Sequence, residues 1–154
     1  MITALAAAFS DPAQVTMVFK LLLAASLGAI IGYERERMSR PAGLRTHILV
    51  AMGACIFGML AFAAYVGTGN EGVMASSIVI GIGFMGAGTI IHYKDKIFGL
   101  TTAASLWITA SIGVAVATGF YLLALAATAI AFMVLSIKHI EETIHEAKAK
   151  RSRR

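Results

Sequence analysis

The sequence predicts an all-α integral membrane protein with five transmembrane helices, its amino terminus outside the cell and its carboxyl terminus in the cytoplasm. Three observations predict this class. Of the 154 residues, 58% are hydrophobic and 14% are charged, whereas about a quarter of the residues in soluble domains are charged. Long apolar stretches cover most of the chain. The basic residues gather in alternate connections between these stretches.

The apolar stretches account for five helices. Residues 15–33, 44–66 and 73–91 each fit one crossing, which needs about 20 apolar residues. Residues 97–137 carry no charge, and as one helix they would be about 62 Å long, roughly twice the thickness of the hydrocarbon core. This stretch must therefore fold back, and Thr118-Gly119 is its best turn.

The basic residues set the orientation. Twelve of the thirteen Lys and Arg residues follow the first, third or fifth helix, and such clusters face the cytoplasm. Lys20, the exception, is interpreted as snorkelling to the outer interface. The expected organisation is an external segment over 1–14, a five-helix domain over 15–138 and a basic amphipathic cytoplasmic tail over 139–154. The tail is expected to contact anionic lipids.

Two segments suggest a duplicated helical hairpin. GAIIGYERE at 28–36 resembles GTIIHYKDK at 88–96, and GLRT at 43–46 resembles GLTT at 99–102. Helices one and two would form one copy and helices three and four the other, with the fifth helix added. The aligned triplets Glu34-Arg35-Glu36 and Lys94-Asp95-Lys96 have inverted charges, so one hypothesis pairs them across the two copies. The alternative is ordinary solvated charges.

A polar site is predicted near the cytoplasmic ends of the first two helices. Glu34 ends the first and Arg45 begins the second, so the two side chains can meet as a buried ion pair. A threonine cap is expected where the fourth helix starts, and Ser105 and Thr109 extend its hydroxyls at helical spacing. Both a ligand site and a structural clasp remain open. The candidate residues are Glu34, Arg35, Arg45, Thr46, His47, Thr101, Thr102 and Ser105.

Glycines mark the predicted packing surfaces. GIGFMGAG at 81–88 contains G-x-G-x-x-G, but a dinucleotide fingerprint needs a preceding strand and a soluble helix, and these glycines lie within a span. They instead favour close helix packing or a cavity. On the first helix, Gly28 and Gly32 suit a dimer contact or packing within the monomer equally well. The packing residues are Gly28, Gly32, Gly81, Gly83, Gly86 and Gly88.

The residue types argue against several functions. No nucleophile, base and acid form a recognisable constellation, so no enzyme is expected. Nucleic-acid binding is disfavoured because the basic tail has no aromatic platform. No cofactor is firmly predicted. Mg²⁺ prefers several oxygen ligands, usually including carboxylates, and no carboxylate lies in the middle of a span. Glu34 is the best metal candidate, and hydrated passage of Mg²⁺ stays open.

The motifs GAIIGYERE, RPAGLRTHILVAMGA, GIGFMGAGTI and GLTTAASLWITASIGV, in this order, resemble the MgtC/SapB family of bacterial inner-membrane proteins. The resemblance covers about residues 15–135. Its signature positions are Glu34, Arg35, Gly43, Leu44, Arg45, Thr46, Gly83, Gly86, Gly88, Thr102 and Trp107. Longer members carry a soluble carboxy-terminal domain that has no counterpart in these residues, and Thr101 stands where those members often have Asn.

The resemblance implies a bacterial cytoplasmic membrane location and a link to magnesium limitation. It also implies virulence-related roles in some members, which act on other membrane proteins such as the proton-driven ATP synthase. Two functions follow as expectations. The first is a non-enzymatic modulator that binds other membrane proteins, with homo-oligomers as an open alternative. The second is a Mg²⁺ transporter or channel. The missing midspan carboxylates favour the modulator.

Overall fold

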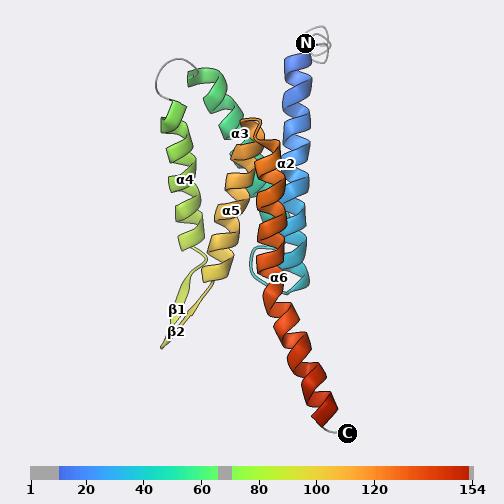
Figure 1. Ribbon diagram of the computed structural model, residues 1–154. Helices are drawn as coiled ribbons and strands as arrows, with labels where there is room; N and C mark the ends of the chain where they lie inside the picture. Colours follow the sequence, from blue (N-terminus) through green and yellow to red (C-terminus); the bar gives the residue numbers. More distant parts are fainter. Residues whose placement is uncertain (1–10, 66–70, 153–154) are drawn as a thin grey trace.

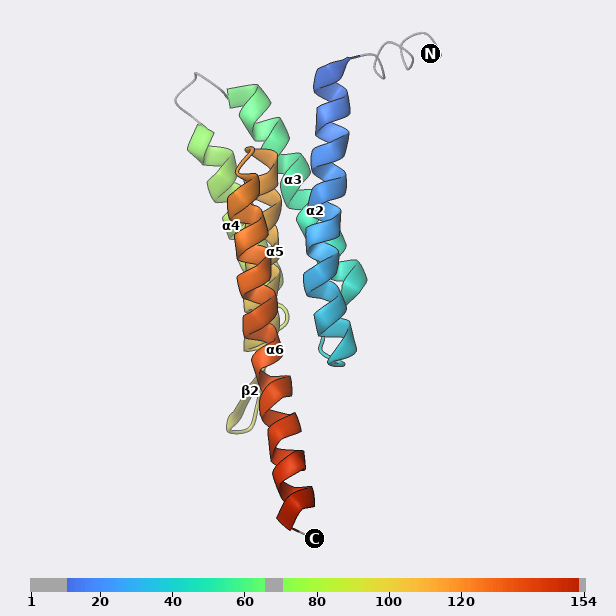
Figure 2. The ribbon, with the colours of Figure 1, turned by 45° about the vertical axis from the view of Figure 1, so that its right-hand side comes forward.

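The computed structural model describes residues 11–65 and 71–152, with side chains at 11–63, 73 and 76–137. Within these ranges, five α-helices run alongside one another and a short hairpin extends from one end (Figures 1 and 2). The elements in chain order are α2 (Pro12–Arg37), α3 (Leu44–Tyr65), α4 (Glu71–Ala87), β1 (Ile91–Tyr93), β2 (Lys96–Phe98), α5 (Leu100–Ala117) and α6 (Tyr121–Ser152).

The helices have the length and composition of membrane spans. Pro12–Arg37, Leu44–Ala63 and Leu100–Ala117 are long and apolar enough to cross a bilayer. Ser76–Ala87 and Tyr121–Ile137 are shorter apolar helices. Large apolar side chains on several helices point outward, such as Phe84, which is 86% exposed. Exposure of so much apolar surface to water would be unfavourable. The chain is therefore a helical membrane protein.

α2 and α3 form a closely packed antiparallel pair. A Cβ built on Gly28 would lie 2.7 Å from the carbonyl oxygen of His47, and one on Gly32 would lie 2.7 Å from the Cα of Leu44. Real side chains cannot approach backbone atoms so closely, so both glycines are needed for this contact. The two alternatives for the G-x-x-x-G motif are thereby resolved in favour of packing within the monomer.

α5 is the central helix, since it packs against α2, α3, α4 and α6. Gly113 faces Ala51 of α3, whose carbonyl oxygen occupies the space that a Cβ would need. Dispersion contacts between closely packed helices, rather than exclusion of water, favour such an arrangement in a bilayer. The core of buried apolar residues is Ala24, Leu27, Ile31, Ala51, Cys55, Ile112, Val116, Ala117 and Ala124.

The connection between α4 and α5 differs from the prediction. The expected helix ends at 91 and 97 are replaced by an antiparallel hairpin, in which Tyr93 pairs with Lys96 across a two-residue turn. Lys94 in this turn has φ +53°. The strands are rich in aromatic and β-branched residues, which favour extended backbone. The apolar pattern alone did not separate these strands from the neighbouring helices.

The hypothesis of paired charged triplets is not supported by the structure. Among the described residues, one ion pair is present, between Arg35 and Glu34. Lys94, Asp95 and Lys96 are exposed on the projecting hairpin, which carries them away from the buried Glu34. The two bends therefore differ in structure, and the duplication is not evident in their geometry.

The turn between α5 and α6 confirms the predicted fold-back. α5 ends at Ala117 with Thr118 as its C-cap, and Gly119 has φ +85°, a left-handed conformation that glycine adopts without strain. Lys20 of α2 is half-buried close to this turn, and its Nζ donates to the carbonyl oxygen of Ala117 at 2.7 Å. The snorkelling interpretation missed this partner, a carbonyl at the negative end of α5.

Apart from Lys20, the basic residues whose side chains are described belong to segments at one end of the bundle (Figure 1). Arg35, Arg37, Arg40 and Arg45 lie around the connection of α2 to α3, and the hairpin carries two lysines. At this end the backbone of α6 continues beyond the other helices (Figure 2). The side chains of the predicted basic tail, 139–154, and most of the predicted external segment, 1–10, lie outside the described residues.

Candidate functional site

Buried polar side chains meet where α2, α3 and α5 pack together. α5 contributes Thr102, Ser105 and Thr109, at spacings of three and four residues that place them on one helix face. All three are buried. Ser105 Oγ donates to the carbonyl oxygen of Thr102 at 2.8 Å, and Thr109 Oγ1 donates to that of Ser105 at 2.7 Å. The hydroxyls thus have partners within their own helix.

His47 of α3 links this face of α5 to the α2–α3 pair. Its side chain is fully buried, with Nδ1 3.0 Å from the carbonyl oxygen of Gly43 and Nε2 3.2 Å from Ser105 Oγ. A carbonyl only accepts, so Nδ1 carries a proton in this arrangement. In the neutral ring, Nε2 then accepts, and the single Ser105 proton is shared between Nε2 and the Thr102 carbonyl.

Arg35 and Glu34 bring opposite charges into the same region. Each residue is only 4% exposed. Arg35 Nη2 donates to Thr102 Oγ1 at 3.4 Å, and Nη1 lies 3.9 Å from Glu34 Oε2. Both distances are long for these interactions. Glu34 Oε1 and Oε2 and Arg35 Nε are buried without a hydrogen-bond partner among the described residues, which makes this pair the least satisfied part of the cluster.

The structure therefore assembles five of the sequence-predicted candidates into one buried polar cluster, which consists of Glu34, Arg35, His47, Thr102 and Ser105, together with Thr109. The predicted pair between Glu34 and Arg45 is wrong. Arg45 is exposed, because the first turn of α3 directs residue 47, and not residue 45, toward α2 and α5. The cluster combines two opposite charges, a histidine and hydroxyls at one end of a membrane bundle.

Thr101 and Thr46 lie outside the cluster. Thr101 is exposed, and the residue that caps α5 is Gly99, with φ +88° and no side-chain hydrogen bond. The expected threonine cap is therefore wrong. A Cβ at Gly99 would overlap the carbonyl of Thr89. Any residue other than glycine at position 99 would therefore clash with this backbone group. Trp107 is 48% exposed.

The glycines of α4 divide into packed and open positions. Gly86 is buried against Ala103 of α5, where an added Cβ would be in ordinary contact at 3.5 Å. Gly88 faces the carbonyl of Met85, in its own segment. An added Cβ at Gly81 or Gly83 would meet nothing within 4 Å. Neither of these two glycines is packed against another helix within the monomer, and Gly81 lines a cavity, which is the other alternative predicted for this segment.

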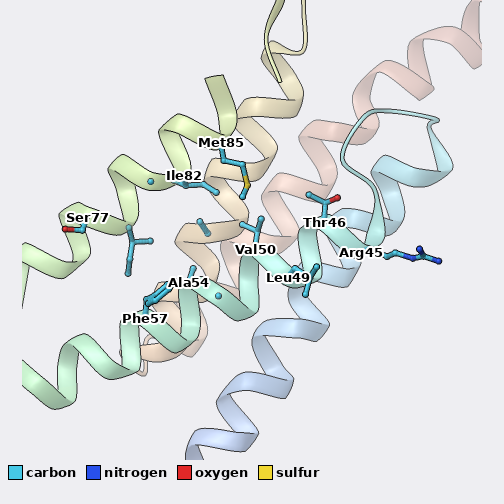
Figure 3. A pocket seen from close by; sticks show the side chains of 13 residues that line it. Arg45, Thr46, Leu49, Val50, Ala54, Phe57, Ser77, Ile82 and Met85 are labelled. Carbon is cyan, nitrogen blue, oxygen red and sulfur yellow. The ribbon is translucent and has the colours of Figure 1, made fainter. Parts of the chain in front are cut away.

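That cavity is a groove of about 610 Å³ between α3 and α4 (Figure 3). One wall includes Leu49, Gly53 and Phe57 of α3, and the other includes Ser77, Gly81 and Met85 of α4. Arg45 and Thr46 lie at one end, and the Arg45 side chain extends away from the groove (Figure 3). In the sequence, the features that correspond to this groove are the many glycines of α4 and Gly53 on α3.

Fold and site together define a helical membrane protein whose buried charged side chains gather near one end of the bundle. The chain belongs to the MgtC family, which matches residues 21–144. It is 37% identical to YhiD of Escherichia coli (strain K12), whose name refers to magnesium transport, over 79% of this chain and 60% of YhiD. It is 46% identical to the protein MgtC of Salmonella typhimurium (strain LT2), over 73% of this chain and 48% of MgtC.

A third relative is SrpB of Synechococcus elongatus, 40% identical over 77% of this chain and 72% of SrpB. The chain thus spans about 60% of the length of YhiD and about half of the length of MgtC. No solved structure is significantly similar to it. The membership establishes a membrane protein of a magnesium-associated family.

Proposed function

We propose that this chain is a non-enzymatic modulator of other membrane proteins in the bacterial cytoplasmic membrane, acting in magnesium homeostasis. All five helices would cross the membrane, with the amino terminus outside and the carboxyl terminus in the cytoplasm. The collection of Arg35, Arg37, Arg40, Arg45 and the hairpin lysines at one end supports this orientation, because basic residues are retained on the cytoplasmic side.

The observation that carries the proposal is the closed interior of the bundle. The core that α2, α3 and α5 share is filled by Leu27, Ile31, Ile112 and other buried apolar side chains. Gly113 brings α5 into backbone contact with α3. Mg²⁺ gives up its hydration waters reluctantly, and a hydrated ion needs a polar passage, so this packing favours a role other than conduction.

The outer surface of α4 favours protein contacts. Ile80 and Phe84 are 72% and 86% exposed, and Gly83 has open space around it. Lipid-facing surfaces that combine small residues with large apolar ones let a second transmembrane helix approach closely. A partner helix, or the same face of a second copy, would find its contact here.

A magnesium transporter or channel is the second candidate. The buried Glu34 carboxylate favours it, because its two oxygens have no hydrogen-bond donor among the described residues and carboxylate oxygens are common Mg²⁺ ligands. The name of the relative YhiD also refers to magnesium transport. Against it, the guanidinium of Arg35 lies 3.9 Å from the same carboxylate and repels a divalent cation.

Flux through the purified chain distinguishes the two functions. The full chain is reconstituted in liposomes that contain a Mg²⁺ indicator, and Glu34→Gln is compared with Glu36→Gln. Glu36 is an exposed carboxylate near the same helix end, so it is a matched control. The modulator predicts no Mg²⁺ entry above protein-free liposomes. Selective entry that Glu34→Gln abolishes and Glu36→Gln leaves unchanged would overturn it.

A positive test of the modulator is mild-detergent co-purification from bacterial membranes under magnesium limitation. Gly83→Leu, which blocks the open face of α4, should reduce recovery of the partner, while Gly53→Leu on α3 should not. Both glycines have space for a side chain, so both variants should retain the fold. Loss of the partner in both variants, or in neither, would contradict a contact on this face.

A further inference from the structure

The groove between α3 and α4 matches the length of one lipid leaflet. Its α3 wall runs from Arg45 to Phe57, which at about 1.5 Å per residue is about 18 Å. Half of the hydrocarbon core is about 15 Å thick. With Arg45 at the membrane surface, the inner end of the groove therefore lies near the middle of the bilayer.

The lining of the groove suits a hydrocarbon chain. The groove has a volume of about 610 Å³. The walls are mainly apolar, and the hydroxyl of Ser77 donates to the carbonyl of Val73 at 3.0 Å within its own helix. The interior therefore offers dispersion contacts to a hydrocarbon chain. The Ser77 hydroxyl does not need a ligand as its acceptor, because it already donates within its own helix.

The open end of the groove carries a positive charge. Arg45 is exposed and takes part in no ion pair among the described residues. Its side chain extends from the first turn of α3, away from the groove (Figure 3). Guanidinium groups bind phosphate with paired hydrogen bonds, and a phospholipid places its phosphate directly above its acyl chains.

From this geometry we infer that the α3–α4 groove is a binding site for one anionic phospholipid. An acyl chain lies between Gly53 and Gly81, and the phosphate lies against Arg45. A Cβ added at either glycine would have no atom within 4 Å. Each wall of the groove therefore has unoccupied space at its glycine, one on α3 and one on α4. The site does not depend on the proposed function, and it is distinct from any lipid contact of the basic tail.

Photolabelling tests the site. The full chain is placed in nanodiscs that contain a trace of phosphatidylglycerol with a diazirine near the end of one acyl chain, and labelled peptides are mapped by mass spectrometry. The expected label lies at the inner end of the groove, on α3 near Phe57 and on α4 near Ser77. Gly81→Leu and Gly53→Leu each put a leucine side chain into the groove and should reduce the label about tenfold, the change that a loss of about 1.4 kcal/mol in binding produces.

Two controls exclude general effects. Gly83→Leu adds the same side chain to α4 outside the groove and should leave the label unchanged. Arg45→Gln should reduce competition by unlabelled phosphatidylglycerol about tenfold, as expected for a lost charge-assisted contact, while Arg37→Gln should not. Circular dichroism verifies that each variant is helical.

Three results would overturn the inference. The first is label spread evenly over the outer helix faces. The second is equal competition by phosphatidylcholine, which would remove the role of charge. The third is label that appears in nanodiscs but is absent from α3 and α4 in native membranes, which would show that another protein occupies the groove.

Discussion

Nε2 of His47 lies 3.2 Å from Oγ of Ser105, a contact that joins α3 to α5 between residues 58 positions apart. Both side chains are buried, so neither group has water as a substitute partner. An unpaired polar group in such surroundings is costly. The contact therefore fixes how the two helices face each other, and its removal has a measurable consequence.

A double-mutant cycle measures this contact. His47→Ala and Ser105→Ala should show a coupling energy of about 0.5–1.5 kcal/mol, the usual net contribution of one hydrogen bond. The measurement is the free energy of unfolding of the chain in mixed micelles. Ser111→Ala is the control because the Ser111 hydroxyl donates to Trp107 in its own helix. His47→Ala and Ser111→Ala should be additive, and a similar coupling in both cycles would argue against a specific contact.

The free energy of unfolding should depend on the balance between the buried charges of Glu34 and Arg35. Glu34→Gln or Arg35→Met leaves one buried charge uncompensated, so each should lower the free energy of unfolding by about 3 kcal/mol. The double variant should recover most of the loss because it removes both charges. Arg37→Met concerns an exposed neighbour and should change stability by less than about 1 kcal/mol. A double variant as unstable as the sum of the singles would contradict the pairing of Glu34 with Arg35.

The close approach of α2 to α3 should be sensitive to one methyl group. Gly32→Ala places a Cβ 2.7 Å from the Cα of Leu44, and such overpacking costs about 1–3 kcal/mol. Gly83→Ala adds the same methyl in open space and should be neutral or stabilising by up to about 1 kcal/mol, since alanine favours helix. Thermal unfolding followed by circular dichroism compares them. Equal melting temperatures for the two variants would show that α2 and α3 have room to separate.

The sequence predicted the polar cluster in part. Helical spacing placed Thr102, Ser105 and Thr109 on one face of α5, and this prediction is confirmed by their burial. The pair of Glu34 with Arg45 failed because spacing along one helix does not say which face of the next helix turns inward. Two residues further along α3, His47 takes the inward position, and the rotation that puts it there follows from the fit of Gly28 and Gly32 against α3.

The sequence by itself determined the membrane class, the helical spans and the turn at Thr118-Gly119. These depend on local composition, because a backbone in lipid must satisfy its own hydrogen bonds and therefore forms helices wherever the chain is apolar. Only the tertiary structure decided that α4 stands partly apart from α3, that Arg45 lies outside the cluster and that Lys20 reaches Ala117. Those features depend on how helix surfaces fit together, and distant residues in the chain set that fit jointly.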